Sequence, residues 1–158
     1  MKIIASQNRR KRWPVGFFLL FSPLFIWGFT TMRATDFTTN SAQTAPEQNN
    51  PDLRTRFYQT SRDDAAKTVQ NLVPTLRTLG RTWKIAASST RNDAIEIRCE
   101  VAVLLFTDDL TISLQSEKNG TRVDVRSQSR VGKADFGENR RHIAQLLRAL
   151  DRQLTVKK

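Results

Sequence analysis

The chain is poor in the residues that build metal and redox centres, with one cysteine and one histidine among 158 residues. A lone cysteine, Cys99, excludes an intrachain disulfide and a thiolate cluster, and a lone histidine, His142, excludes a multi-histidine metal site. Cys99 lies in an apolar alternation, so we expect a buried free thiol. His142 stands between Arg141 and Ile143, and we expect it to face solvent. We therefore expect neither a metal ion nor a cofactor.

Concentrated positive charge is missing from most of the chain. Of the 26 lysines and arginines, six precede the first acidic residue, Asp36, and the others interleave with the 15 acids. Few aromatic residues follow position 33, and no two have the spacing of a stacking platform on one predicted strand. Proteins that bind nucleic acid rely on a basic stripe or on such a platform. We therefore expect no nucleic-acid partner.

The first 33 residues have the composition of a membrane anchor or an export signal. Four bases at positions 9–12 precede an uncharged run at residues 13–32. As a helix, this run would span roughly 30 Å of hydrocarbon. The basic flank predicts that the N-terminus stays on the cytoplasmic side while the rest of the chain crosses the membrane. The candidate cleavage sites after this run fit poorly, which favours an uncleaved anchor over a cleaved signal. We expect a domain on the extracytoplasmic side (periplasm or lumen), or a secreted domain if the segment is cleaved.

Residues 34–60 are rich in threonine, asparagine, glutamine and proline and poor in aliphatic residues. A segment of this composition buries too little apolar surface to fold alone. We expect a polar, disordered linker that holds the following domain away from the bilayer. Leu53, Phe57 and Tyr58 are available to pack its end against that domain.

Two helices are expected in residues 61–158. Ser61 precedes two acids and an apolar helical repeat, which predicts an N-cap and a helix. Pro74 should kink this helix, and Gly80 should end it. A second apolar face, running from Ile143 to Leu154, predicts the last helix of the chain.

Four strands are expected between these helices. Alternation of period two predicts strands near 83–87, 95–106, 110–114 and 122–131. Turns are expected at 91–93 and 107–109, and the Lys118-Asn-Gly120 sequence predicts a hairpin. The expected fold is α+β, with a four-stranded antiparallel sheet and both helices packed on one face.

The densest set of polar groups lies at residues 121–141, TRVDVRSQSRVGKADFGENRR. Strand alternation places Arg126 and Arg130 on one face of the sheet and Ser127 and Ser129 on the other. The Asp-Phe-Gly-Glu sequence that follows has the form of a capping box. The candidate binding residues in and near this stretch are Asp108, Asp109, Arg126, Ser127, Ser129, Arg130, Lys133, Asp135, Gly137, Asn139 and Arg141.

Two interpretations of these residues stay open. In the first, Arg126, Arg130 and Lys133 join the N–H groups around Gly137 at the start of the last helix to bind an anion. In the second, the protein's own carboxylates take the place of a bound anion. Asp135 caps the helix, and the adjacent acids at 108–109 pair with an arginine across the sheet. Such a network would join strand to helix and bind no ligand.

The serines and acids of this region do not form a complete catalytic set. Ser127 and Ser129 would need a base within hydrogen-bond reach, and no Gly-x-Ser-x-Gly elbow is present. Asp108 and Asp109 alone are too few oxygen ligands to indicate a hard-cation site. We therefore assign no catalytic residue and no metal ligand.

Three segments resemble the domain-of-unknown-function family 1499: WKI at 83–85, FTDD at 106–109 and, above all, RSQSRVGKADFGENRRHI at 126–143. The resemblance covers residues 61–154 and implies a small α+β domain behind an export signal or membrane segment. It places the family's signature on Gly132 and on every candidate residue above except Lys133. Ala134 departs from this pattern, since the family usually has a small hydroxyl residue there. The segment that often opens the family's domain also has no counterpart at 46–61. The resemblance implies no activity.

These observations together predict a membrane-anchored or exported module that binds or scaffolds through an arginine-rich anion or carboxylate contact. One alternative is a hydrolase or isomerase with Asp108 or Asp109 as base and arginines clamping an anionic substrate. Another is an accessory subunit of a membrane complex. The incomplete catalytic set argues against the enzyme.

Overall fold

The computed structural model of the chain describes residues 39–133 and 135–156. Its elements in chain order are β1 (Ser41–Gln43), η2 (Pro51–Leu53), β2 (Arg56–Tyr58), α2 (Arg62–Leu72), η3 (Val73–Thr75), β3 (Arg77–Thr78), β4 (Arg81–Thr82), β5 (Lys84–Arg91), β6 (Ala94–Val103), β7 (Phe106–Glu117), β8 (Gly120–Ser129) and α3 (Glu138–Asp151). The expected anchor at 1–33 lies outside the described residues. Within them, no helix has the length and apolar content needed to cross a membrane.

The main sheet has six strands in the order β1-β8-β7-β6-β5, with β2 also paired to β8. All of these pairings are antiparallel, and β3 and β4 form a separate small hairpin. The α+β class is confirmed, but the expected number of four strands is wrong. The two additional strands, β1 and β2, have three residues each, which is too short to show a strand periodicity in the sequence.

Strands β1 and β2 both lie within residues 34–60, which composition assigns to a disordered linker. β1 and β2 pair with successive parts of β8, which would otherwise present an unpaired edge. The Tyr58 ring is fully buried, and its hydroxyl donates to Asp151 Oδ1 at 2.8 Å. Gly120 permits the close approach of β2, because a Cβ there would lie 2.0 Å from the Tyr58 carbonyl oxygen. Backbone pairing therefore holds a segment that has few apolar side chains.

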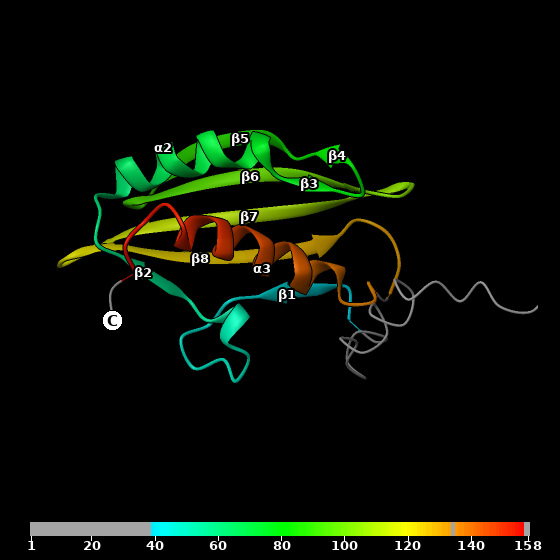
Figure 1. Cartoon of the computed structure of the whole chain (residues 1–158), viewed down its shortest axis with the longest axis horizontal. Coiled ribbons are helices and arrows are strands. Elements are labelled where there is room, and N and C mark those ends of the chain that lie inside the picture. Colours follow the sequence, from blue (N-terminus) through cyan, green and yellow to red (C-terminus); the bar gives the residue numbers. More distant parts are fainter. Residues whose placement is uncertain (1–38, 134, 157–158) are drawn as a thin grey trace, which may run out of the picture. The chain divides into compact units, whose positions relative to one another are not determined.

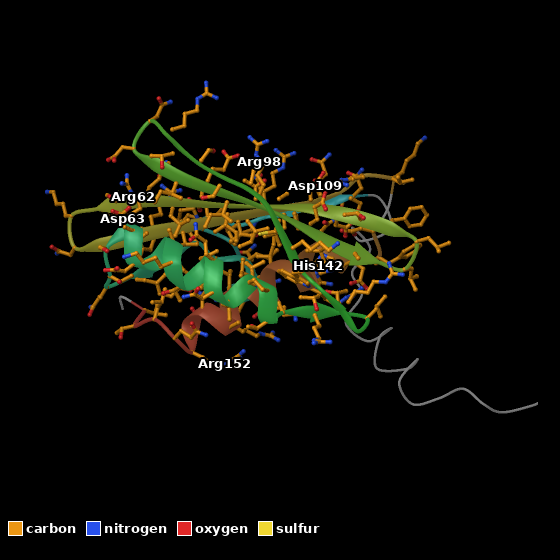
Figure 2. The ribbon with its side chains drawn as sticks, turned by 90° about the horizontal axis from the view of Figure 1, so that it is seen from above. Arg62, Asp63, Arg98, Asp109, His142 and Arg152 are labelled. Atoms are coloured by element: carbon orange, nitrogen blue, oxygen red, sulfur yellow. The ribbon has the colours of Figure 1, made fainter. Side chains whose placement is uncertain are left out.

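Helices α2 and α3 lie together in front of the sheet in Figure 1 and below it in the perpendicular view of Figure 2. The apolar face of α2 contributes buried residues such as Val69 and Leu72, and that of α3 contributes Ile143 to Leu150. They meet buried side chains from β6, β7 and β8. Trp83, just before β5, is also buried, and its Nε1 donates to Thr78 Oγ1 at 2.9 Å. One core therefore lies between the helices and one face of the sheet.

Several local predictions are confirmed. Ser61 is the N-cap of α2, and its side-chain oxygen accepts from Asp64 N at 3.1 Å. The hairpin at Lys118-Asn-Gly120 joins β7 to β8, and Cys99 is a buried free thiol. Burial raises the pKa of this thiol to about 12.

Other boundaries differ from the prediction. The first helix ends at Leu72, and Pro74 lies in the 3-10 turn that follows rather than in a kinked helix. Gly80 belongs to the turn between β3 and β4, and so does not cap α2. Asp108 and Asp109 lie inside β7 instead of forming a turn, because the chain reverses earlier, at Leu104-Leu105.

Candidate functional site

The sheet separates the candidate residues into two groups. Asp108 lies opposite Ser129 and Leu110 opposite Ser127, with these side chains on the helix-covered face. The alternate residues lie on the face turned away from α2 and α3, which we call the open face. Figure 2 shows Asp109 and Arg98 on this side of the sheet and His142 on the other. The motif therefore does not converge on one site.

Asn139 is the centre of the group on the helix side. Its side chain is fully buried at the start of α3, and its Oδ1 accepts from Ser127 Oγ at 2.6 Å. Its Nδ2 donates to Ser129 Oγ at 3.0 Å and to the Asn40 carbonyl at 2.8 Å. The Asn139 amide thus joins β8, α3 and the segment before β1 by hydrogen bonds. These polar groups therefore stabilise the fold.

Asp135 caps the start of α3, although in a different register from the expected capping box. Its carboxylate accepts from Gly137 N at 2.9 Å and from Asn139 N at 3.1 Å. Gly137 is the N-cap residue at φ 79°, a left-handed conformation that glycine adopts without strain. Glu138 does not reach back to the cap, because its carboxylate accepts from Arg141 Nη2 at 2.6 Å. The N–H groups expected to receive an anion are therefore bound to Asp135.

His142 is buried, which corrects the expectation that it faces solvent. Its ring is 1% exposed and lies edge-on to Trp83, with 5.7 Å between ring centroids. Its Nδ1 lies 3.5 Å from Asp108 Oδ2 and its Nε2 lies 3.7 Å from Glu138 Oε2. Among the described residues, neither ring nitrogen has a hydrogen-bond partner of good geometry.

Burial favours the neutral form of both members of this pair. Removal from water lowers the pKa of His142 to about 4, against an opposing influence of Glu138. Removal from water also raises the pKa of Asp108, which is 3% exposed, and a hydrogen bond from Ser129 partly offsets this effect. The pair is therefore a buried polar contact between β7 and α3.

On the open face, Arg130 forms ion pairs with two carboxylates. Its guanidinium lies 2.6 Å from Asp109 Oδ1 and 2.6 Å from Glu100 Oε1, and these bonds raise its pKa. The internal pairing of an arginine with one of the adjacent acids, expected as one alternative, is thus present. Lys133 is exposed in the loop before α3.

Arg126 has a different environment on the same face. It is exposed and donates to Gln128 Oε1 at 3.0 Å. Among the described residues, no carboxylate lies within salt-bridge distance of it. Arg126 pairs with Thr111, and Thr111 with Arg98, so these residues form a row across β8, β7 and β6. Adjacent strands are about 4.8 Å apart, which puts the two arginine Cα atoms about 10 Å apart.

The geometry offers little for catalysis or for metal binding. Ser129 is hydrogen-bonded to Asp108 and Asn139 rather than to His142. Within residues 39–133 and 135–156, no group of three His, Cys, Asp or Glu side chains could hold a metal ion. A surface hollow of about 550 Å³ lies at the far end of the sheet, lined by Gln59–Arg62 and by residues of the β7–β8 hairpin. It contains none of the candidate residues.

Four residues of these two groups are not among the candidates predicted from the sequence: His142, Glu100, Thr111 and Arg98. Helical spacing could have found His142, because positions 139, 142, 143 and 146 share one face. The three others come from strands β6 and β7, and only the strand register places them beside Arg126 and Arg130.

Comparison with known proteins agrees with the resemblance seen in the sequence. Residues 29–150 match the family profile described as "Protein of unknown function (DUF1499)". No curated protein matches the chain significantly. Among solved structures, the crystal structure of TTHA0849 from Thermus thermophilus is similar, with 13% sequence identity and a TM-score of 0.34. That similarity covers 72% of this chain and 95% of the other. The chain belongs to the DUF1499 family of proteins of unknown function.

Proposed function

We propose that this domain is a non-catalytic binding module, held at a membrane on the extracytoplasmic side, that contacts a carboxylate-bearing partner through its open face. Arg126 is the centre of the contact. The observation that carries the proposal is that Arg126 is an exposed cation with no carboxylate within reach among the described residues.

Arg126 differs from the other arginines of β8, which are paired with carboxylates. Arg130 is paired with Asp109 and Glu100, and Arg122 with Asp124 at 2.7 Å. The fold therefore neutralises the other arginines of β8 and leaves Arg126 available. A guanidinium binds carboxylates with two parallel hydrogen bonds, and the Thr111 hydroxyl beside it can donate a third.

The shape of the open face favours a macromolecular partner. Arg98, Thr111 and Arg126 lie on consecutive strands of a sheet, and the hollow described above is at a different place. Small molecules are usually held in concave pockets, whereas flat polar faces suit proteins and other polymers. An acidic segment of a protein partner fits this description.

Membrane attachment is supported by the sequence alone. The uncharged run at 13–32 behind a basic cluster has the length and flank of an anchor. An accessory subunit of a membrane complex is a special case of the same proposal, because its partner would be another chain. Such a chain would co-purify in stoichiometric amount from mild detergent and would be lost on Arg126→Glu.

The enzyme alternative has less support. Asp109 is engaged by Arg130, and Asp108 points into the core beside His142. A general base must reach a substrate proton, and neither acid is free to do so in this arrangement.

The contact can be tested with a fluorescent oligoglutamate peptide as the probe. Its affinity is measured by anisotropy for the full chain in detergent, for Arg126→Gln and for the control Arg91→Gln. Arg91 is also an exposed arginine, but it lies at the β5–β6 turn. Losing a charge-assisted hydrogen bond should weaken binding about tenfold for Arg126→Gln. The control should change it less than about twofold, since it removes only general charge. Equal weakening by both variants, or no binding by the unmodified chain, would contradict the carboxylate contact.

A further inference from the structure

Five large apolar side chains are exposed in the two loops at one end of the sheet. They are between 51% and 91% exposed, and Leu105 is the most exposed of them. We call this set the apolar rim; its members are Leu104, Leu105, Phe106, Val131 and Phe136. Single exposed apolar residues are ordinary, but a cluster of this kind marks a contact surface.

The rim comes from two loops that the sheet brings together. Leu104 and Leu105 form the β6–β7 turn, and Phe106 follows them as the first residue of β7. The Arg130 N–H donates to the Thr107 carbonyl at 3.4 Å, which brings Val131 to the level of Phe106. Figure 1 shows the β6–β7 turn and the loop between β8 and α3 at the same end of the sheet.

One non-glycine residue in each of these two loops has a left-handed backbone. Leu104 and Phe136 have φ of 48° and 52°, a left-handed conformation that is unfavourable for residues with bulky side chains. The β5–β6 turn at the other end of β6 uses Asn92 and Asp93 for the same conformation, and these residues tolerate it well. At Leu104 the left-handed backbone and the exposed apolar side chain both cost stability, which favours a role for this turn in a contact outside the domain.

Thr39 and Asn40, which follow the uncharged run in the sequence, also lie at this end. The Asp135 N–H donates to the Thr39 carbonyl at 3.1 Å, and Asn40 Nδ2 donates to the Gly132 carbonyl at 3.0 Å. Thr39 is seven residues after Met32, the last residue of the uncharged run. Seven extended residues reach at most about 25 Å. A domain attached to a bilayer through that run would therefore have this end close to the bilayer surface.

We infer that the apolar rim inserts into the interfacial layer of the bilayer and fixes the orientation of the domain. The partner is lipid: apolar side chains on a protruding turn can enter the boundary between headgroups and acyl chains. Lys133 lies in the same loop as Val131 and is exposed, so its ammonium can meet a lipid phosphate. The inference rests on the membrane attachment in the proposed function, but not on the carboxylate contact of Arg126.

The test compares the two ends of β7. A cysteine is introduced at Leu105 or, as the matched control, at Lys118 in the exposed β7–β8 turn, roughly 40 Å away along the strand. Each variant is labelled with an environment-sensitive fluorophore. Cys99 should not react, since it is 1% exposed and burial raises the pKa of its thiol to about 12. The full chain is then reconstituted into phosphatidylcholine–phosphatidylglycerol vesicles that carry a nitroxide quencher near the headgroups.

Insertion of the rim predicts that lipid-borne nitroxide quenches the label at 105 at least about twofold more than the label at 118. Flotation of the vesicles reports attachment separately. A chain that floats without selective quenching at 105 overturns the rim contact and leaves the anchor intact. A chain that does not float overturns both. A label at 105 that is shielded only at high protein concentration, without lipid quenching, assigns the rim to a second copy of the chain and also overturns the inference.

Discussion

His142 Nδ1 lies 3.5 Å from Asp108 Oδ2 in the interior, between the first turns of α3 and the start of β7. Both groups are removed from water, and burial shifts the pKa of each towards its neutral form. The stability of the domain should therefore depend on pH through His142, which was expected from the sequence to face solvent.

The fold should lose stability as the pH falls from about 6.5 to about 4. The pKa of His142 is lowered from 6.5 to about 4 on folding, so in this window the unfolded chain binds more protons and acid favours unfolding. One proton changes the unfolding free energy by about 1.4 kcal/mol per pH unit, which gives a loss on the order of 3 kcal/mol. Urea unfolding at pH 7 and pH 4.5 measures the change.

Two variants identify the source of this pH dependence. His142→Gln removes the titrating ring, so its unfolding free energy should vary much less over the same window. Asp108 acts in the opposite sense, because its raised pKa contributes stability that is complete below 3.8 and lost as the pH rises through the folded-state value. Asp108→Asn should therefore steepen the acid loss. The same profile for His142→Gln and for the unmodified chain would show that His142 is not the source of the pH dependence.

Replacing Asn139 with alanine should destabilise the fold by about 2–3 kcal/mol. The substitution leaves the buried Ser127 hydroxyl without its acceptor and removes the bonds to Ser129 and Asn40. Urea unfolding followed by circular dichroism gives the value. Gln128→Ala, which truncates an exposed side chain on the open face, is the control and should stay within about 0.5 kcal/mol. A small effect at Asn139 would mean that the hydroxyls find other partners and that the motif does not maintain the fold.

Replacing Leu104 with asparagine should stabilise the domain by about 0.5–1 kcal/mol. Asparagine tolerates the left-handed backbone of this turn, and Leu104 is mostly exposed, so little packing is lost. Leu105→Asn is the comparison, because Leu105 is still more exposed and does not have a positive φ. That variant should leave the denaturation midpoint nearly unchanged. A loss of stability in Leu104→Asn would show that the leucine packs against the domain, which would weaken the argument for the apolar rim.

The predicted helices and hairpins were identified mainly from local rules. The Ser61 cap, the apolar faces of α2 and α3 and the hairpin before Gly120 follow from side-chain spacing and turn chemistry, which act within a few residues. The errors arose where a distant segment decides the structure. β1 and β2 have three residues each, and it is their pairing with β8, a distant segment, that makes them strands.

In the candidate site, too, local sequence patterns were not enough to place single residues. The expectation of a turn at 107–109 interrupted the alternation of β7, so Asp108 and Asp109 could not be assigned to opposite faces. The actual turn contains two leucines and lacks glycine and asparagine, the residues that usually indicate a reversal.

Sequence patterns were enough to establish the α+β class, the family and the positions of most polar groups along the chain, because periodicity and caps are local properties. What those groups do depends on the tertiary structure. Pairing of β7 with β8 directs Asp108 and Ser127 to the core and Arg126 and Arg130 to the open face. A side chain in a sheet acquires its partners from neighbouring strands, so whether an arginine is neutralised or available depends on the register.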